Sequence, residues 1–313
     1  MKKTPKKSTH INLSQSTANT VREKALSAFE EFDASNADGS GHFPIVPEIK
    51  TEVLSFLARR PLHTAVLTGL LLENGGGGES RYGGFYGYRS DSGKLDGVAL
   101  LGRATIFEAR TEAALAAFAC LARKLPAFRL ALAENEPLQM FWNAYKVPGQ
   151  HPQLLCNEWL YEYSNPRRPW QPVTAFRAGT VADLDLIVKA HAELVEEETQ
   201  VNPLDTDPEG FRDRCAARVK QGKVWVYIKD GELIFKADVA TETPSSVYIE
   251  GLWVNPNQRR QGYGKRCLEQ LRQLLCPNDG VLCGFVNETN QAANNFYKQV
   301  GCSFLSSYQK IYL

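Results

Sequence analysis

The chain has 313 residues, with 36 Lys and Arg against 35 Asp and Glu, and a formal net charge of +1. This balance excludes a strong global field that would attract nucleic acid or an anionic membrane. The length allows two domains, each with its own hydrophobic core. The best apolar run, Ala65 to Leu72, is far shorter than the ~20 residues that a bilayer requires, so we expect no membrane span.

The N-terminal residues 1–44 are predicted to form a basic, disordered tail and a leading helix. The tail has no apolar core, so it is not a secretory signal, and we favour a solvated tail over a nucleic-acid-binding arm. It contains four early lysines among Ser, Thr and Asn residues: Lys2, Lys3, Lys6 and Lys7.

The 7 cysteines are scattered and include no Cys-x-x-Cys pair. We therefore expect reduced thiols in a cytoplasmic protein. The 5 histidines show no metal-ligand spacing, so we predict no metal site, and a structural role is favoured for His191.

Residues 45–163 are predicted to form a first α/β domain. The strand 104–108 leads into its helix through Ala109-Arg110-Thr111, without a glycine that would admit a phosphate. The predicted strands are 84–88, 95–101, 104–108, 128–133 and 158–163, and the predicted helices are 111–124 and 137–145.

Residues 164–172 contain three prolines, which fit neither a helix nor a central strand, and are predicted to form a linker. A second α/β domain is expected over 173–313. Its local signals are a capping box at Thr180 and Asp183, a helix start at Asp207-Pro208 and a hairpin turn at Asp230-Gly231.

A turn rich in arginine and glycine joins the strand 246–254 to the helix 265–275. Gly262 and Gly264 let the backbone adopt positive φ and approach a ligand, so that successive amides point at one anion. The helix start and the charges of Arg259, Arg260 and Lys265 favour the same anion. The turn therefore predicts a pyrophosphate site.

Two nucleotide-binding motifs fail on residue identity. A Walker A loop needs Gly at 259 and Ser or Thr at 266, where the chain has Arg259 and Arg266. A Rossmann fingerprint needs Gly or Ala at 267, where the chain has Cys267.

The turn instead has the form [Gln/Arg]-x-x-Gly-x-[Gly/Ala], after a strand ending Val-x-Pro. It resembles the acetyl-CoA loop of the GNAT superfamily of N-acetyltransferases. A second motif from Asn290 to Gly301 matches the family pattern Asn-x-x-Ala-x-x-x-Tyr-x-x-x-Gly. Cys302 replaces the usual Phe after that glycine, which affects packing more than chemistry.

The resemblance implies an α/β fold, in which a mixed, mostly antiparallel sheet is flanked by helices. Because 45–163 repeats the element order of 173–313, we expect tandem GNAT-like domains, the first a degenerate copy that has lost its cofactor site. The chain also resembles two-domain GNAT proteins whose N-terminal domain has no assigned function, in the segments Ser55 to Pro61 and Leu95 to Leu100.

The implied activity is transfer of an acetyl group from acetyl-CoA to a primary amine, by direct attack in a ternary complex. Tyr297 is the candidate acid for the thiolate and Glu250 the candidate base, with Glu242 and Glu196 as weaker substitutes. The candidate acetyl-CoA contacts are Leu252, Trp253, Val254, Arg259, Arg260, Gln261, Gly262, Tyr263, Gly264, Lys265 and Asn290.

Two alternatives stay open: a catalytically silent acetyl-CoA sensor, and an interaction module in which this domain is a scaffold. Tyr297 and Glu250 favour catalysis over the sensor. The sequence leaves the acceptor open between a small-molecule amine and a peptide amine.

Overall fold

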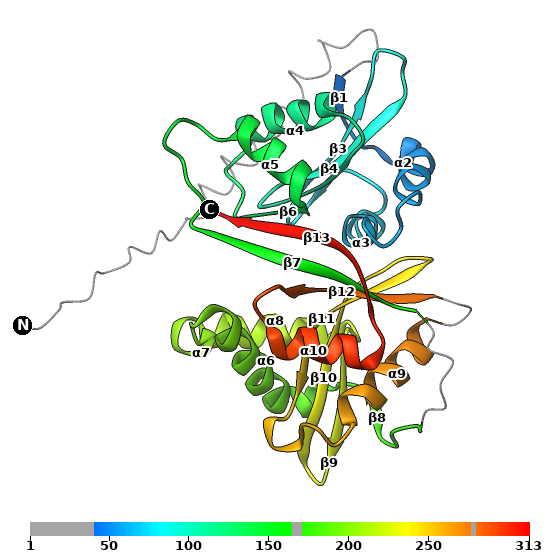
Figure 1. Cartoon of the computed structure of the whole chain (residues 1–313), viewed down its shortest axis with the longest axis vertical. Helices are drawn as coiled ribbons and strands as arrows, with labels where there is room; N and C mark the ends of the chain where they lie inside the picture. The colour runs from blue at the N-terminus through cyan, green and yellow to red at the C-terminus, as the bar shows by residue number, and fades with distance from the viewer. Residues whose placement is uncertain (1–40, 165–170, 277–279) are drawn as a thin grey trace, which may run out of the picture.

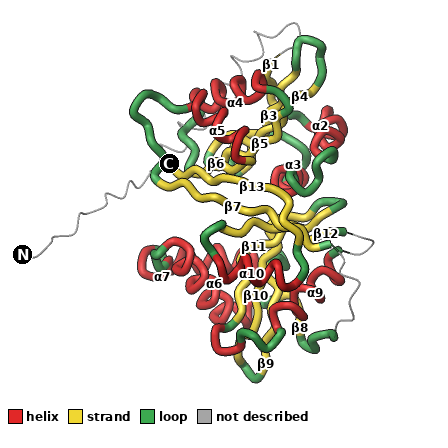
Figure 2. Tube along the Cα trace, in the orientation of Figure 1, coloured by secondary structure: helices red, strands yellow, loops and turns green. Residues whose placement is uncertain are grey.

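The computed structural model describes residues 41–164, 171–276 and 280–313. Its strands form a single continuous sheet that runs through both halves of the molecule (Figure 1). The strand order is β1-β3-β4-β5-β6-β13-β7-β12-β11-β10-β9-β8, with β2 paired to β3. Helices flank the strands in each half (Figure 2).

The first half contains every helix and strand predicted for it. Its strands are β1 (Gly41–Pro44), β2 (Glu79–Ser80), β3 (Gly83–Arg89), β4 (Leu95–Gly102), β5 (Ala104–Ala109), β6 (Leu130–Glu134) and β7 (Leu154–Tyr163). Its helices are η1 (Pro47–Ile49), α2 (Lys50–Leu57), α3 (Ala65–Glu73), α4 (Glu112–Lys124) and α5 (Asn135–Tyr145). The sequence analysis did not predict β1, α2 or α3. Of the predicted leading segment, residues 41–44 form strand β1 rather than a helix, and 1–40 lie outside the described residues.

The second half contains the strand predicted over 246–254 and the helix predicted over 265–275, which begins two residues earlier, at Tyr263. Its strands are β8 (Phe176–Ala178), β9 (Val224–Lys229), β10 (Glu232–Glu242), β11 (Ser246–Val254), β12 (Val281–Asn287) and β13 (Ser303–Tyr312). Its helices are η2 (Val181–Asp183), α6 (Leu184–Thr199), α7 (Pro203–Thr206), α8 (Pro208–Lys220), η3 (Pro256–Gln258), α9 (Tyr263–Leu275) and α10 (Gln291–Val300).

Local signals in the sequence account for several of these boundaries. The Asp183 carboxylate accepts from the Thr180 amide at 2.8 Å and completes the predicted capping box before α6. The Asp207 side chain accepts from the Gly210 amide at 3.0 Å and begins α8. Asp230 and Gly231 have φ of 53° and 79°, as a tight hairpin turn between β9 and β10 requires.

The two halves share one topology. β5 runs parallel to β6 with α4 between them in sequence, and β11 runs parallel to β12 with α9 between them. The remaining strand pairs are antiparallel. The predicted tandem arrangement of mostly antiparallel sheets is confirmed.

Two long strands are exchanged between the halves. β7, from the first half, pairs antiparallel with β12 of the second half, from Asn287↔Glu158 to Leu282↔Tyr163. β13, the last strand of the chain, lies between β6 and β7 (Figure 1). The predicted linker at 164–172, of which 165–170 lie outside the described residues, therefore separates the two halves in sequence. A single sheet nevertheless runs through both halves.

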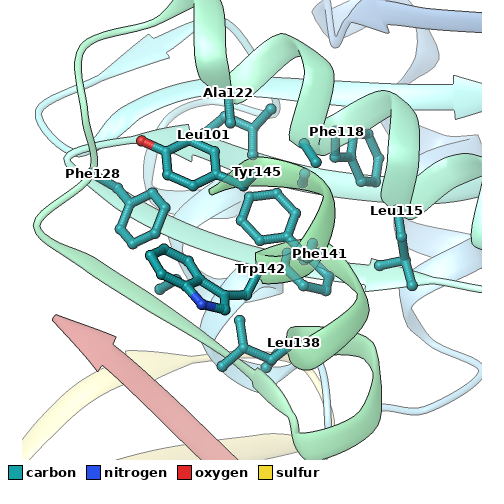
Figure 3. Packing of buried hydrophobic residues seen from close by; sticks show 14 of the residues in the cluster. Leu101, Leu115, Phe118, Ala122, Phe128, Leu138, Phe141, Trp142 and Tyr145 are labelled. Carbon is teal, nitrogen blue, oxygen red and sulfur yellow. The ribbon is translucent and has the colours of Figure 1, made fainter. Parts of the chain in front are cut away.

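Buried clusters lie on both sides of this shared sheet. An aromatic cluster in the first half brings together Phe128, Phe141, Trp142 and Tyr145 (Figure 3). A cluster at the junction includes Ala65 of α3, whose carbonyl accepts from the Thr241 hydroxyl of β10 at 3.3 Å. The apolar run at the start of α3 thus packs against the second half.

All seven cysteines are free thiols. Among the described residues, no group of His, Cys, Asp or Glu side chains could hold a metal ion. No helix in the described ranges is long and apolar enough to cross a bilayer.

Candidate functional site

An opening forms where β11 and β12 part. The two strands pair only from Ser246↔Val281 to Tyr248↔Cys283, whereas β11 stays paired with β10 as far as Val254↔Phe235. The next residue of β12 is Gly284, where an added Cβ would lie 2.8 Å from the Ile249 carbonyl oxygen. Beyond this close approach, residues 249–254 of β11 face the opening along the edge that β12 does not pair.

A bulge turns β11 at the middle of this opening. Glu250 pairs with Asp238 and Trp253 with Lys236, so the register shifts across Gly251, whose φ is 59°. A Cβ at Gly251 would meet the Asp238 Oδ2 at 2.9 Å, so a side chain would not fit there. After the bulge, Leu252 and Val254 pack toward α9 and α10, and Trp253 packs toward α6 and α8.

The predicted phosphate turn begins α9 with open backbone amides. Gly262 lies at the helix start with φ of 81°, and an added Cβ there would have no neighbour within 4 Å. The Arg266 amide donates to the Gly262 carbonyl at 3.1 Å, which is the first hydrogen bond of the helix. The amides of the preceding residues in the turn therefore have no carbonyl partner within the helix. Such amides, together with the helix dipole, favour an anion at this position.

Gly264 has a different role from the one predicted. It lies inside α9 without a positive φ, so the prediction of a left-handed conformation at this residue is wrong. An added Cβ would stand 3.0 Å from the Phe296 ring and 3.2 Å from a Val254 methyl carbon. Gly264 therefore lets α9 pack closely on α10 and β11.

The charged side chains of the turn divide into tethered and exposed ones. The Arg259 Nε donates to the Val254 carbonyl at 3.1 Å, which ties the turn to the end of β11. Arg260, which has φ of 63°, and Lys265 are exposed at the helix start. Gln261 donates to the Gln258 side chain at 3.0 Å, and the Tyr263 ring lies 5.7 Å from that of Tyr227. The turn therefore presents an exposed positive charge beside the open amides.

Tyr297 lies on the α10 side of the sheet, next to the point where the strands part. It lines a cavity of about 10 Å³ with Ile249 and Gly284, and its side chain is buried. Burial raises the pKa of the Tyr297 phenol well above its ordinary value, so the group is neutral and keeps its proton. At the helix start, the Asn290 Oδ1 accepts from the Ala293 amide at 2.9 Å and caps α10.

Glu250 lies on the opposite side of the sheet, toward α6 and α8. Its carboxylate forms an ion pair with Arg218 of α8, and its side chain is 41% exposed. The Arg218 Nη1 also lies 3.7 Å from the Asp238 Oδ2, and Asp238 pairs with Lys236 at 2.7 Å. Tyr297 and Glu250 thus approach the opening between β11 and β12 from its two faces.

His191 of α6 belongs to the packing around this ion-pair group. Its ring stacks on Phe211 at a centroid distance of 5.3 Å, and its Nδ1 lies 3.9 Å from the Asp238 Oδ2. Burial, and then the charges of Lys236 and Arg218, lower the pKa of His191 to about 3. The imidazole is therefore neutral at physiological pH, in agreement with the predicted structural role.

Sequence reasoning missed the partners of both candidate catalytic side chains. Tyr161 of β7 stacks on Tyr297, and Asn294 of α10 accepts from the Tyr161 hydroxyl. Arg218 and Asp238 surround Glu250. Each contact joins segments that are distant in sequence, or neighbouring strands whose register the sequence did not reveal.

Residues 188–302 match the acetyltransferase (GNAT) family. No curated protein matches the chain significantly in sequence.

Solved structures resemble the whole two-lobed fold. A Drosophila protein superposes with a TM-score of 0.59 at 14% identity, covering 88% of this chain and 99% of its own. A tandem GNAT protein from the clavulanic acid biosynthesis pathway gives 0.51 at 13% identity, with coverage of 86% and 97%. A GCN5-related N-acetyltransferase from Sphaerobacter thermophilus gives 0.50 at 12% identity, with coverage of 86% and 94%.

At these sequence identities, the solved structures are similar to this chain in fold alone. The family match covers the turn at Gly262 and the helix that carries Tyr297. The chain therefore has the fold of tandem GNAT proteins, and its residues 188–302 match the acetyltransferase (GNAT) family.

Proposed function

We propose that this chain transfers an acetyl group from acetyl-CoA to a primary amine, by direct attack in a ternary complex. The observation that carries the proposal is the open, basic start of α9 at the end of the parted strand β11. A pyrophosphate fits there because Gly262 leaves the space beside it free.

Acetyl-CoA would be held along the opening by residues of both motifs. The amides of 262–265 and the charges of Arg260 and Lys265 would hold the pyrophosphate, while the unpaired edge of Leu252 to Val254 would offer main-chain groups to the pantetheine arm and the acetyl carbonyl. Asn290 would support this end of the site by holding the start of α10. When bound, acetyl-CoA supplies the acetyl group as an activated thioester.

Glu250 is proposed to help remove a proton from the acceptor, directly or through a water molecule. Deprotonating a lysine-like amine of pKa ~10.4 at pH 7 costs about 4 to 5 kcal/mol, whereas an α-amino group of pKa ~8 costs only about 1 kcal/mol. A base is therefore most useful for the more basic acceptor. The ion pair with Arg218 fixes the direction of the Glu250 carboxylate.

Tyr297 is proposed to protonate the departing thiolate. A phenol of pKa ~10 is a weaker acid than a thiol of pKa ~8.5, so this transfer is uphill by about 2 kcal/mol before the effect of burial. Burial favours the neutral phenol further, so the proton must move late, as the carbon–sulfur bond breaks and negative charge gathers on sulfur.

An acceptor panel tests the proposal with the intact chain. Free thiol release and product mass are followed with N-terminal peptides, lysine peptides, polyamines and amino acids. We expect acetylation of at least one amine class, together with slow acetyl-CoA hydrolysis, and a fall of roughly 10² in the rate of acetylation in Tyr297→Phe. Binding of acetyl-CoA with neither hydrolysis nor transfer would instead identify the chain as a sensor.

A further inference from the structure

The strand exchange brings a residue of the first half into contact with the proposed acid. Tyr161 lies on β7 opposite Gly284 of β12, and its side chain points under α10. Its ring lies parallel to that of Tyr297, with an interplanar angle of 19° and centroids 5.4 Å apart. This stacking restricts the directions in which the Tyr297 ring can turn.

A buried hydrogen-bond chain fixes Tyr161 in turn. Its hydroxyl donates to the Asn294 Oδ1 at 3.1 Å, and the Asn294 Nδ2 donates to the carbonyls of Asn287 and Glu288 at 3.0 Å and 3.1 Å. Tyr161 and Asn294 are each only 1% exposed. Because water does not replace a lost partner at such a depth, this network holds the end of β12 and the first turns of α10 in one arrangement.

We propose that Tyr161 is a positioning residue for acetyl transfer: β7 of the first half sets the orientation of the Tyr297 phenol at the opening in the second half. The proposal rests on the proposed function, in which Tyr297 donates a proton. It gives the first half an indirect part in the chemistry, through strand β7, which pairs with β12 of the second half.

Two variants separate the ring from the hydroxyl. Tyr161→Leu removes the stack and the hydrogen bond, and we expect kcat to fall about 10-fold with the KM for acetyl-CoA within about twofold, because misplaced catalytic groups lose rate rather than ground-state binding. Tyr161→Phe keeps the stack and should show a smaller loss in kcat. The control is Tyr163→Phe on the same strand, whose hydroxyl donates to Glu269 of α9 at 2.6 Å, and which should leave kcat unchanged.

A double-mutant cycle tests whether Tyr161 acts through Tyr297. In a Tyr297→Phe background, Tyr161→Leu should cause little further loss of kcat, since the proton that it helps to place is already gone. Equal losses of kcat in both backgrounds would overturn the positioning role. If Tyr297→Phe is itself as active as the parent, the proposed acid fails instead, and the two failures are thereby distinguished.

Hydrogen exchange of the unliganded chain gives a readout that is independent of activity. Tyr161→Phe should speed amide exchange at the first turns of α10 at least several-fold, because the Asn294 side chain loses its donor, whereas Tyr163→Phe should not. If Tyr161→Leu does not fold, Tyr161→Phe still decides the question, since it keeps the buried ring. Unchanged exchange and unchanged kcat in Tyr161→Phe would overturn the proposal.

Discussion

Helices α4 and α9 occupy the same place in the two halves, yet their first turns differ in chemistry. Each follows one strand of a parallel pair and leads to the other. In α4 the Thr111 hydroxyl caps the Ala114 amide at 3.2 Å, and Glu112 adds a negative charge to the first turn. In α9 a left-handed Gly262 leaves the amides open, and Lys265 adds a positive charge. The first residues of the same fold element thus favour an anion at the start of α9 and disfavour one at the start of α4.

The helices that follow the second parallel strand differ in the same way. Seven residues after the cap of each helix stand Phe141, counted from Glu134 of α5, and Tyr297, counted from Asn290 of α10. Phe141 packs against Phe128 and Tyr145, at centroid distances of 6.3 Å and 5.8 Å (Figure 3). A phenyl ring carries no polar hydrogen, so this position cannot supply a proton in the first half.

The openings between the parallel strands complete the contrast. β5 and β6 also part, after Ile106↔Leu132, but an ion-pair group fills the space. Arg60 lies 2.7 Å from Glu134 and 3.2 Å from Glu108, and the Ser306 hydroxyl of β13 donates to Glu134 at 2.7 Å. The first half therefore uses this position to hold β13, which supports the view that its cofactor site has been lost.

The largest expected effect comes from exchanging the aromatic residue at the paired helix positions. Tyr297→Phe should lower kcat by roughly 10², while the affinity for acetyl-CoA stays within a few fold, because the proton is needed only late in the reaction. Phe141→Leu should leave kcat unchanged and lower the free energy of unfolding by about 1 to 2 kcal/mol. Steady-state kinetics and urea unfolding measure both. A folded Phe141→Leu with reduced kcat would break the comparison.

The paired glutamates give the next largest effect. Glu250 and Glu108 each stand two residues beyond the last parallel pair of their strand. Glu250→Gln should weaken the acidic limb of the pH–rate profile and cost up to about 10² in rate for a lysine-like acceptor, and less for an α-amine. Glu108→Gln should lower the melting temperature through its ion pairs and leave the pH profile unchanged. Identical profiles for Glu250→Gln and the parent would exclude Glu250 as the base.

Two glycines with matching backbones test the phosphate turn. Gly262 and Gly149 have φ of 81° and 82°, and an added Cβ meets no atom within 4 Å at either position. Valine strains both backbones by ~1 kcal/mol or more, but only Gly262→Val places a side chain where the pyrophosphate must approach. Calorimetry should show at least a tenfold loss of acetyl-CoA affinity for Gly262→Val and none for Gly149→Val. Equal losses would mean that strain, not the site, is responsible.

The smallest effect concerns the capped helix of the first half. Thr111→Ala removes the acceptor for the Ala114 amide and should lower the free energy of unfolding by about 1 kcal/mol. Because α4 takes no part in cofactor binding on this account, acetyl-CoA affinity should stay within twofold. Weaker binding in a folded Thr111→Ala would show that the first half contacts the cofactor.

Most elements and the glycine turn before α9 followed from the sequence, because their signals are local. The Asp230-Gly231 turn, the Thr180 cap and the glycine at 262 each depend on neighbouring residues alone. The strand exchange did not follow, since β7 and β13 have ordinary strand patterns that do not encode which distant edge they pair.

The same limit applies within the site. Tyr297 was identified from its spacing to Asn290, but its stacking partner Tyr161 lies on an exchanged strand. Gly264 was assigned to the ligand because the glycine-rich turn favours positive φ and close backbone approach, while its actual contact, Phe296, is far along the chain. The residue types in the two motifs predicted the proposed chemistry. The side chains that pack against Tyr297 and Gly264 are set by tertiary contacts, which the sequence does not reveal.

The central claim is that one half binds acetyl-CoA and the other half completes its sheet. Calorimetric titration of the intact chain tests it most directly, because the exchanged strands make separated halves unsuitable. The account predicts one acetyl-CoA per chain, with affinity reduced at least tenfold by Gly262→Val and unchanged by Thr111→Ala. Two sites per chain, or one site that Gly262→Val leaves intact, would contradict it.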